Sequence, residues 1–82
     1  MMLEECKVGP IERLRLKAKY GDLREAYSIN EDFTVILLQQ EDGISFVTRF
    51  SHPDGTQYYK LSDEELVSFH EMITHYLYCR KI

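Results

Sequence analysis

The side chains with the means to do chemistry in this 82-residue sequence are three histidines, two cysteines and a set of acids. His70 and His75 are five residues apart, which puts them about 140° apart around a helix, so they cannot both reach one metal ion. His52 lies in a predicted turn. Cys6 and Cys79 lie near opposite ends of the sequence and match no zinc-binding spacing. We therefore expect free thiols, histidines that bind no metal, and no metal site.

Motifs for nucleophilic catalysis and for phosphate binding are missing as well. The sequence has no Gly-x-Ser-x-Gly elbow, no Gly-x-x-x-x-Gly-Lys loop and no Gly-x-Gly-x-x-Gly run, and it holds only four glycines. Paired acids do occur, but they fall in predicted turns, where acids are common. We expect a protein that is not an enzyme and needs no cofactor.

Charge is unevenly distributed along the sequence. Residues 7–24 carry six cations and two acids, a net charge of +4, whereas residues 25–65 carry nine acids and two cations, a net charge of −7. The acids of the second region gather in turns beside aromatic residues, and tyrosine is enriched in protein interfaces. We therefore predict a protein-binding surface. Its candidate residues are Glu41, Asp42, Asp54, Tyr58 and Tyr78.

The basic region supports a second hypothesis, a single-stranded nucleic-acid-binding protein. Four cations recur at every second position, and on a strand they would form one row that could follow a line of phosphates. These residues are Arg13, Arg15, Lys17 and Lys19. A simpler interpretation is that the cations keep an outer strand soluble.

The elements that must position these residues are clearest at the C-terminal end. Ser62 and Glu65 form a capping box that predicts a helix over residues 62–80. Its apolar residues recur at spacings of three and four, which gives a single stripe expected to pack on a sheet. The stripe consists of Leu66, Phe69, Ile73, Tyr76 and Leu77.

The middle of the sequence predicts strands separated by turns. Residues 32–40 are apolar on both pleat faces, residues 44–50 alternate, and residues 57–61 form a shorter strand. Glu41-Asp42-Gly43 and Pro53-Asp54-Gly55 supply the turns. Residues 24–29 predict one more short strand.

Residues 11–20 are ambiguous. They are good helix formers, yet residues 13–20 alternate strictly between cations and apolar side chains, and we favour a strand over a helix. Either choice gives an α+β fold: a single domain over residues 1–82, with an antiparallel β-meander of three to five strands and a C-terminal helix packed on one face.

Two local patterns resemble known families. From Phe33 to Ile82, strands, a Pro-Asp-Gly turn and a capped helix resemble the single-stranded-DNA-binding transcriptional coactivators, although the basic positions of that sheet are mostly missing here. The segment from Val35 to Gly43 is similar to a hairpin of the phage inhibitors of uracil-DNA glycosylase, which implies an acidic inhibitor.

These patterns together predict a small non-enzymatic binding protein, a phage or bacterial regulator or inhibitor that acts on a protein partner. Apolar residues on the flanks of the helix stripe predict a homodimer. The N-terminal acids and the lack of a long apolar run predict a cytoplasmic protein with no membrane contact.

Overall fold

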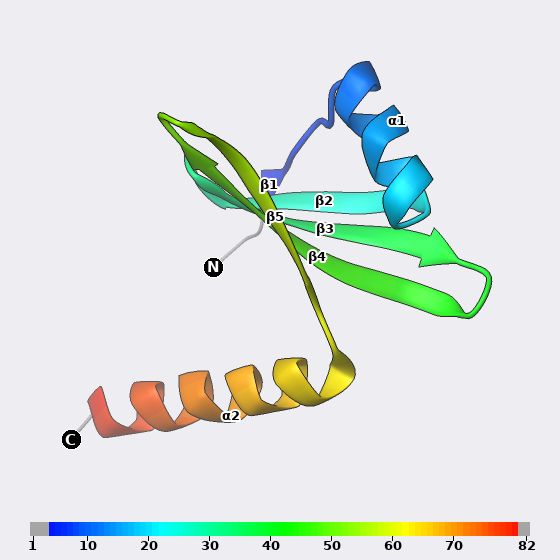
Figure 1. The fold of residues 1–82 in the computed structure, drawn as a ribbon. Coiled ribbons are helices and arrows are strands. Elements are labelled where there is room, and N and C mark those ends of the chain that lie inside the picture. The colour runs from blue at the N-terminus through cyan, green and yellow to red at the C-terminus, as the bar shows by residue number, and fades with distance from the viewer. Residues whose placement is uncertain (1–3, 81–82) are drawn as a thin grey trace.

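The computed structural model describes residues 4–80, which form a five-stranded antiparallel sheet and two helices. The strands lie in sequence order, as in a meander (Figure 1). They are β1 (Glu4–Glu5), β2 (Asp22–Asn30), β3 (Phe33–Gln40), β4 (Gly43–His52) and β5 (Gly55–Leu61). The helices are α1 (Pro10–Lys19) and α2 (Asp63–Arg80). The predicted α+β meander with a C-terminal helix is confirmed.

The register of the sheet follows the alternation in the sequence. Ile36 on β3 pairs with Ala26 on β2 and with Val47 on β4, and all three side chains are buried on one face. We call this the closed face, because α1 lies over it and adds Leu16 and Tyr20 to the core. The core is therefore small, and it lies between α1 and the middle strands.

The preference for a strand over residues 11–20 is wrong, since residues 10–19 form α1. Pro10 stands at the helix start, where its missing N–H costs no hydrogen bond, and Lys17 and Lys19 lie in the last turn, where they complement the helix dipole. Leu16 and Tyr20, four residues apart, share one face and reach the core, while Leu14 points outward and is exposed. The alternating pattern alone could not separate these two arrangements.

Gly21 lets the chain turn sharply from α1 into β2. Its φ is +121°, and a Cβ there would lie 2.2 Å from the carbonyl oxygen of Gln39. Only glycine tolerates both conditions, so this residue fixes how closely the end of α1 approaches the end of β3.

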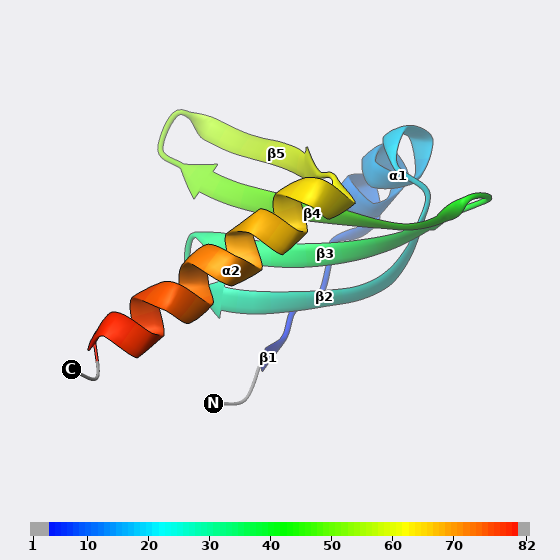
Figure 2. The ribbon, with the colours of Figure 1, turned by 90° about the horizontal axis from the view of Figure 1, so that it is seen from below.

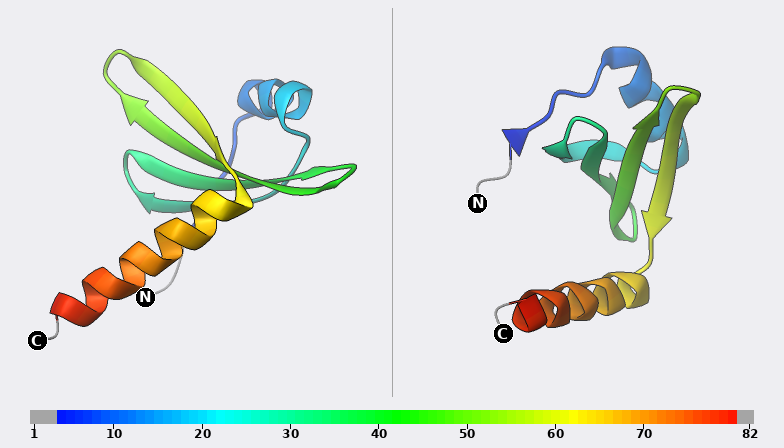
Figure 3. Two further views of the ribbon diagram at one scale, coloured as in Figure 1. Left: turned by 60° about the horizontal axis from the view of Figure 1, so that its bottom comes forward. Right: turned by 90° about the vertical axis from the view of Figure 1, so that its left-hand side faces the viewer.

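The expected packing of the C-terminal helix on the sheet is not observed. The helix begins where the capping box predicts, but none of its described residues is buried. Figures 1 and 3 show α2 running away from β5 below the sheet, on the side opposite α1. Seen from below in Figure 2, it passes diagonally across the strands without joining the sheet.

Candidate interaction surfaces

The sheet face opposite α1 is the more apolar of the two, and we call it the open face. Its residues alternate with those of the core: Val35 flanks buried Ile36, and Phe46 flanks buried Val47. Phe50 contacts Phe33 edge to face, with ring centroids 4.6 Å apart. Most of these side chains bury one another in part, whereas Ile44 and Tyr59 are more than half exposed. The open face consists of Phe33, Val35, Leu37, Ile44, Phe46, Phe50, Tyr59 and Leu61.

Helix α2 carries a second uncovered apolar surface. Seven of its large hydrophobic side chains are at least two-fifths exposed. Five residues share one side at helical spacing, and we call them the α2 stripe: Leu66, Phe69, Ile73, Tyr76 and Leu77. An exposed apolar patch of this kind is typical of contact sites for other molecules. Tyr78, predicted to bind protein, is exposed, but it lies on the other side of α2 from the stripe.

A short, rigid connection joins the two apolar surfaces. Ser62 is the single residue between β5 and α2. Its backbone N–H donates to Glu65 Oε1 at 3.0 Å, and its hydroxyl oxygen accepts from the Glu65 N–H at 3.2 Å. This confirms the capping box. Hydrogen bonding from the Ser62 backbone N–H, and secondarily from the Ser62 side chain, lowers the pKa of the Glu65 carboxyl. A groove beside the junction is lined by Leu61, Glu64, Glu65, Ser68, Phe69 and Met72.

The predicted acidic residues lie at two opposite ends of the sheet. Glu41 and Asp42 form the turn between β3 and β4, whereas Asp54 lies in the turn between β4 and β5, at the other end of ten-residue β4. A strand of that length spans about 33 Å. Asp54 instead shares its end with Glu31 and Asp32, since the Ser51 N–H donates to the Asp32 carbonyl at 2.8 Å. One partner surface of ordinary size therefore cannot be centred on both turns.

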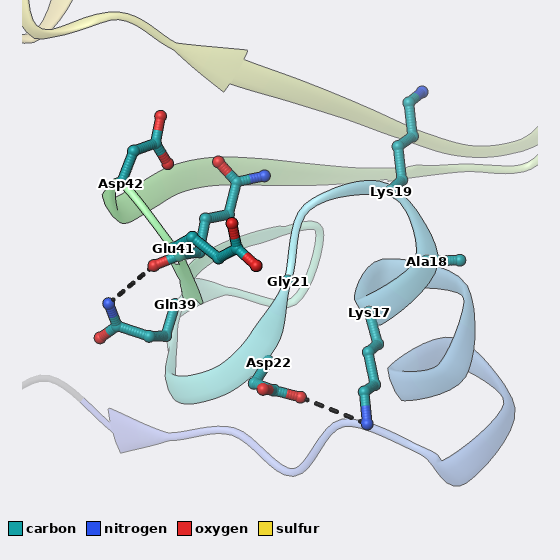
Figure 4. A pocket seen from close by; sticks show the side chains of 9 residues that line it. Lys17, Ala18, Lys19, Gly21, Asp22, Gln39, Glu41 and Asp42 are labelled. Atoms are coloured by element: carbon teal, nitrogen blue, oxygen red, sulfur yellow. Dashed lines mark hydrogen bonds and ion pairs between the residues drawn. The ribbon is translucent and has the colours of Figure 1, made fainter.

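The end that holds Glu41 and Asp42 also holds cations. Lys17 and Lys19 at the end of α1 line one hollow with these two acids (Figure 4). Lys17 Nζ lies 3.5 Å from Asp22 Oδ1, and Lys19 Nζ lies 5.3 Å from the centre of the Tyr20 ring. Basic and acidic residues that are separated along the sequence therefore lie side by side in the fold.

The predicted row of four cations does not exist in the structure. On a helix, residues two apart point about 160° apart, so Arg13 and Lys17 lie on one flank of α1, and Arg15 and Lys19 lie on the other. All four side chains are exposed, but they face different directions. The alternation that would have aligned them belongs to a strand, which this segment does not form.

Tyr58 was predicted to face a protein partner, but it belongs to a polar cluster under α1. Arg49 Nη1 donates to both Glu12 carboxylate oxygens, at 2.6 and 2.8 Å, and the Tyr58 hydroxyl donates to Glu12 Oε2. Arg49 Nη2 donates to the hydroxyl of buried Thr34 at 3.1 Å and contacts Cys6 Sγ at 3.7 Å. We call these five residues the clamp, because they join α1, β3, β4, β5 and the segment before α1.

Burial and hydrogen bonding together shift the pKa values in the clamp. Partial burial and the bond to Glu12 raise the pKa of Tyr58 to about 12. Burial alone would lower the pKa of Arg49, but the hydrogen bonds and negative charge of Glu12 outweigh it and raise that pKa. No buried side-chain nitrogen or oxygen among the described residues lacks a hydrogen-bond partner, and the bonds to Glu12 hold α1 against the sheet. The sequence offered one signal for it, an isolated arginine in the middle of an otherwise uncharged strand.

The cysteines are free, as predicted. On α2, His75 Nε2 lies 3.5 Å from Cys79 Sγ, four residues further along the helix. No group of three metal-ligating side chains gathers anywhere in residues 4–80.

Comparison with protein-family models, with curated proteins and with solved structures found no match for this chain. Within residues 4–80, neither helix is long and apolar enough to cross a membrane.

Proposed function

We propose that this chain is a small, non-enzymatic binding protein that regulates or inhibits through protein–protein contact, with the α2 stripe and the open face as its contact surface. The observation that carries the proposal is the exposure of α2. An 18-residue helix presents seven large hydrophobic side chains and buries none of its residues. Short isolated helices are marginal in water, and their stability in proteins comes from covering an apolar side.

The sequence predicts that acidic turns and aromatic residues bind the partner. In this proposal the aromatic residues form the contact surface, and the acidic residues have a smaller role. Phe69, Tyr76 and Tyr59 lie on the uncovered surfaces and offer large contact areas. The acidic end with Glu31, Asp32 and Asp54 lies at the margin of the sheet, where charge speeds association more than it adds affinity.

Capture of partners from extracts of the source cell, with and without nuclease treatment, tests this function. Ile73→Glu, in the middle of the stripe, should lose the proteins that the wild type retains, because a buried unpaired charge is costly. His75→Glu adds the same charge on the far side of α2 and should retain them. Retention that is unaffected by Ile73→Glu and lost on nuclease treatment would favour single-strand binding instead.

A further inference from the structure

The molecule exposes far more surface than a compact monomer of its mass. A folded 9.8 kDa chain exposes roughly 5,200 Å². This chain exposes 7010 Å², about 1,800 Å² more, whereas a standard protein interface covers about 800 Å² on each partner. The radius of gyration is 14.2 Å, against roughly 12 Å for a compact domain of this length. The excess is large enough for an extensive, obligate type of interface.

The α2 stripe and the open face match each other in size. From Leu66 to Leu77 the stripe extends about 17 Å along the helix, at 1.5 Å per residue. The four strands β2 to β5 span about 14 Å from first to last. The stripe residues are all apolar or aromatic. On the open face, the paired charged residues are Glu25, opposite Leu37, and Glu5, opposite Tyr27, both at the β1–β2 margin, so an acidic partner finds no complement there. A helix with this stripe would cross the sheet and cover it.

The short junction between β5 and α2 favours a covering helix from outside the chain. Leu61 is still paired with Phe46 in the sheet, and Asp63 is already helical. Only Ser62 lies between them, and its two capping bonds with Glu65 keep α2 helical from its first turn. The chain therefore has a single residue at which α2 could turn back over its own sheet.

We propose that the occupant is a second copy of this chain, and that α2 of each copy lies across the open face of the other in a two-fold symmetric dimer. This inference rests on the proposed function, since it uses the same contact surface. A second copy brings one stripe and one open face, so the symmetric exchange covers both surfaces on both chains.

Sedimentation over a range of protein concentrations tests the dimer. The wild type should sediment with twice the mass of 9.8 kDa, while Ile73→Glu on the stripe and Ile44→Glu on the open face should each sediment as monomers. Ile44 is exposed in the single chain, so its substitution leaves the fold of the sheet intact, which circular dichroism checks. His75→Glu, on the far side of α2, should remain dimeric.

Mixing the two monomeric variants tests the exchange itself. The Ile44→Glu chain keeps an intact stripe, and the Ile73→Glu chain keeps an intact open face, so one of the two contacts can form between them. The mixture should therefore contain heterodimers, although each variant alone is monomeric. A dimer that persists in Ile44→Glu, or a mixture that stays monomeric, would overturn the helix-on-sheet exchange.

Hydrogen exchange of the α2 amides separates this inference from the proposed function. In a dimer their protection should rise with protein concentration. A wild-type monomer with unprotected α2 amides overturns the dimer and leaves the proposed function standing. A wild-type monomer with protected amides means that α2 folds back on its own sheet, which overturns both.

Discussion

Arg49 is the residue on which the closed side of the molecule depends most. Its guanidinium group joins a carboxylate from α1 to a hydroxyl from β3, and both it and Glu12 are about four-fifths shielded from water. Hydrogen bonds to charged groups contribute more than neutral ones when water is excluded. The clamp therefore fixes α1 over the closed face with a directional contact that the small apolar core does not provide.

We expect Arg49→Met to lower the free energy of unfolding by about 1–3 kcal/mol, because the Glu12 carboxylate and the Thr34 hydroxyl each lose a charged partner. Urea denaturation measures this. The exposed pair Lys17 and Asp22 provides the control, since Lys17→Met should change stability by less than about 0.5 kcal/mol. Equal effects of the two substitutions would contradict the role of the clamp.

The pKa of Tyr58 provides a second test at the same site. Because its pKa is raised to about 12, Tyr58 should be the last tyrosine to ionise in an absorbance titration, and Tyr58→Phe should remove that final step. The folded state favours the protonated phenol, so its contribution to stability is complete below the ordinary tyrosine pKa of about 10. That contribution should be lost as the pH rises from there through about 12.

Three glycines, two at turns and Gly9 at the start of α1, form a graded series. Gly21 combines a positive φ with a close neighbour, Gly43 has a positive φ in open space, and Gly9 has neither. Substitution by alanine should therefore destabilise most at Gly21, by about 1–3 kcal/mol or more, less at Gly43, and least at Gly9. Thermal melts of the three variants give the order, and a Gly21 variant as stable as the Gly9 variant would refute the close contact with Gln39.

At the scale of elements, the two helices differ in what holds them. Helix α1 begins at Pro10, has no side-chain cap, and is held by the clamp and by two buried residues, Leu16 and Tyr20. Helix α2 has a complete capping box and no buried residue. The local sequence therefore sets the start of α2, whereas burial against the rest of the chain contributes nothing to holding its described residues.

The cap of α2 can be tested separately from its partner. Ser62→Ala should lower helix stability by about 0.5–2 kcal/mol, because the Glu65 N–H loses the hydroxyl oxygen that accepts its hydrogen bond. Circular dichroism of the monomeric Ile73→Glu background should show the loss as reduced helicity. Because the pKa of Glu65 is lowered, the carboxylate's contribution is present above its unfolded pKa and lost as the pH falls through the folded value. Glu65→Gln, which keeps a cap acceptor, should remove that pH dependence.

At the scale of the whole molecule, α1 and α2 lie on opposite sides of one sheet and leave its faces unequal. The closed face is covered and joined to α1 by the clamp, and the open face and the α2 stripe are both uncovered. Lys17 and Lys19, at the end of α1, lie beside the acids of the turn between β3 and β4. When opposite charges lie so close together, each weakens the electrostatic field of the other at a distance. This arrangement disfavours a phosphate-binding face.

The contribution of the α1 cations to nucleic-acid binding can be measured in a variant that has Gln at four positions. These are Arg13, Arg15, Lys17 and Lys19. Single-stranded oligonucleotides should bind the wild type only weakly at physiological salt. Because the four cations lie on two flanks of α1, one strand can contact about two of them. The salt dependence of binding should then fall by about 1.4 log units per log unit of salt in the variant. A fall of about 2.8 would mean that all four cations contact the strand together.

The sequence by itself determined the local elements of this protein. Strand periodicity, the Asp-Gly turns and the Ser62 capping box predicted β2 to β5 and α2, because these features depend on neighbouring residues. The segment of residues 11–20 was the exception. Its alternation suits a strand, and its residues suit a helix. In the helix, Leu16 and Tyr20 pack together in the core against the sheet. This tertiary contact selects the helix over the strand.

Only the tertiary structure decided which surfaces are covered. The pleat divides β3 and β4 into two faces, but both faces carry apolar residues, and no local pattern says which one receives a helix. Ile44, Phe46 and Phe50 share one apolar face of β4, yet α1 covers the opposite face, which carries Ile36 and Val47. The clamp likewise joins Glu12 to residues 37 and 46 positions away. Contacts over such separations depend on the path of the whole chain, which local spacing does not encode.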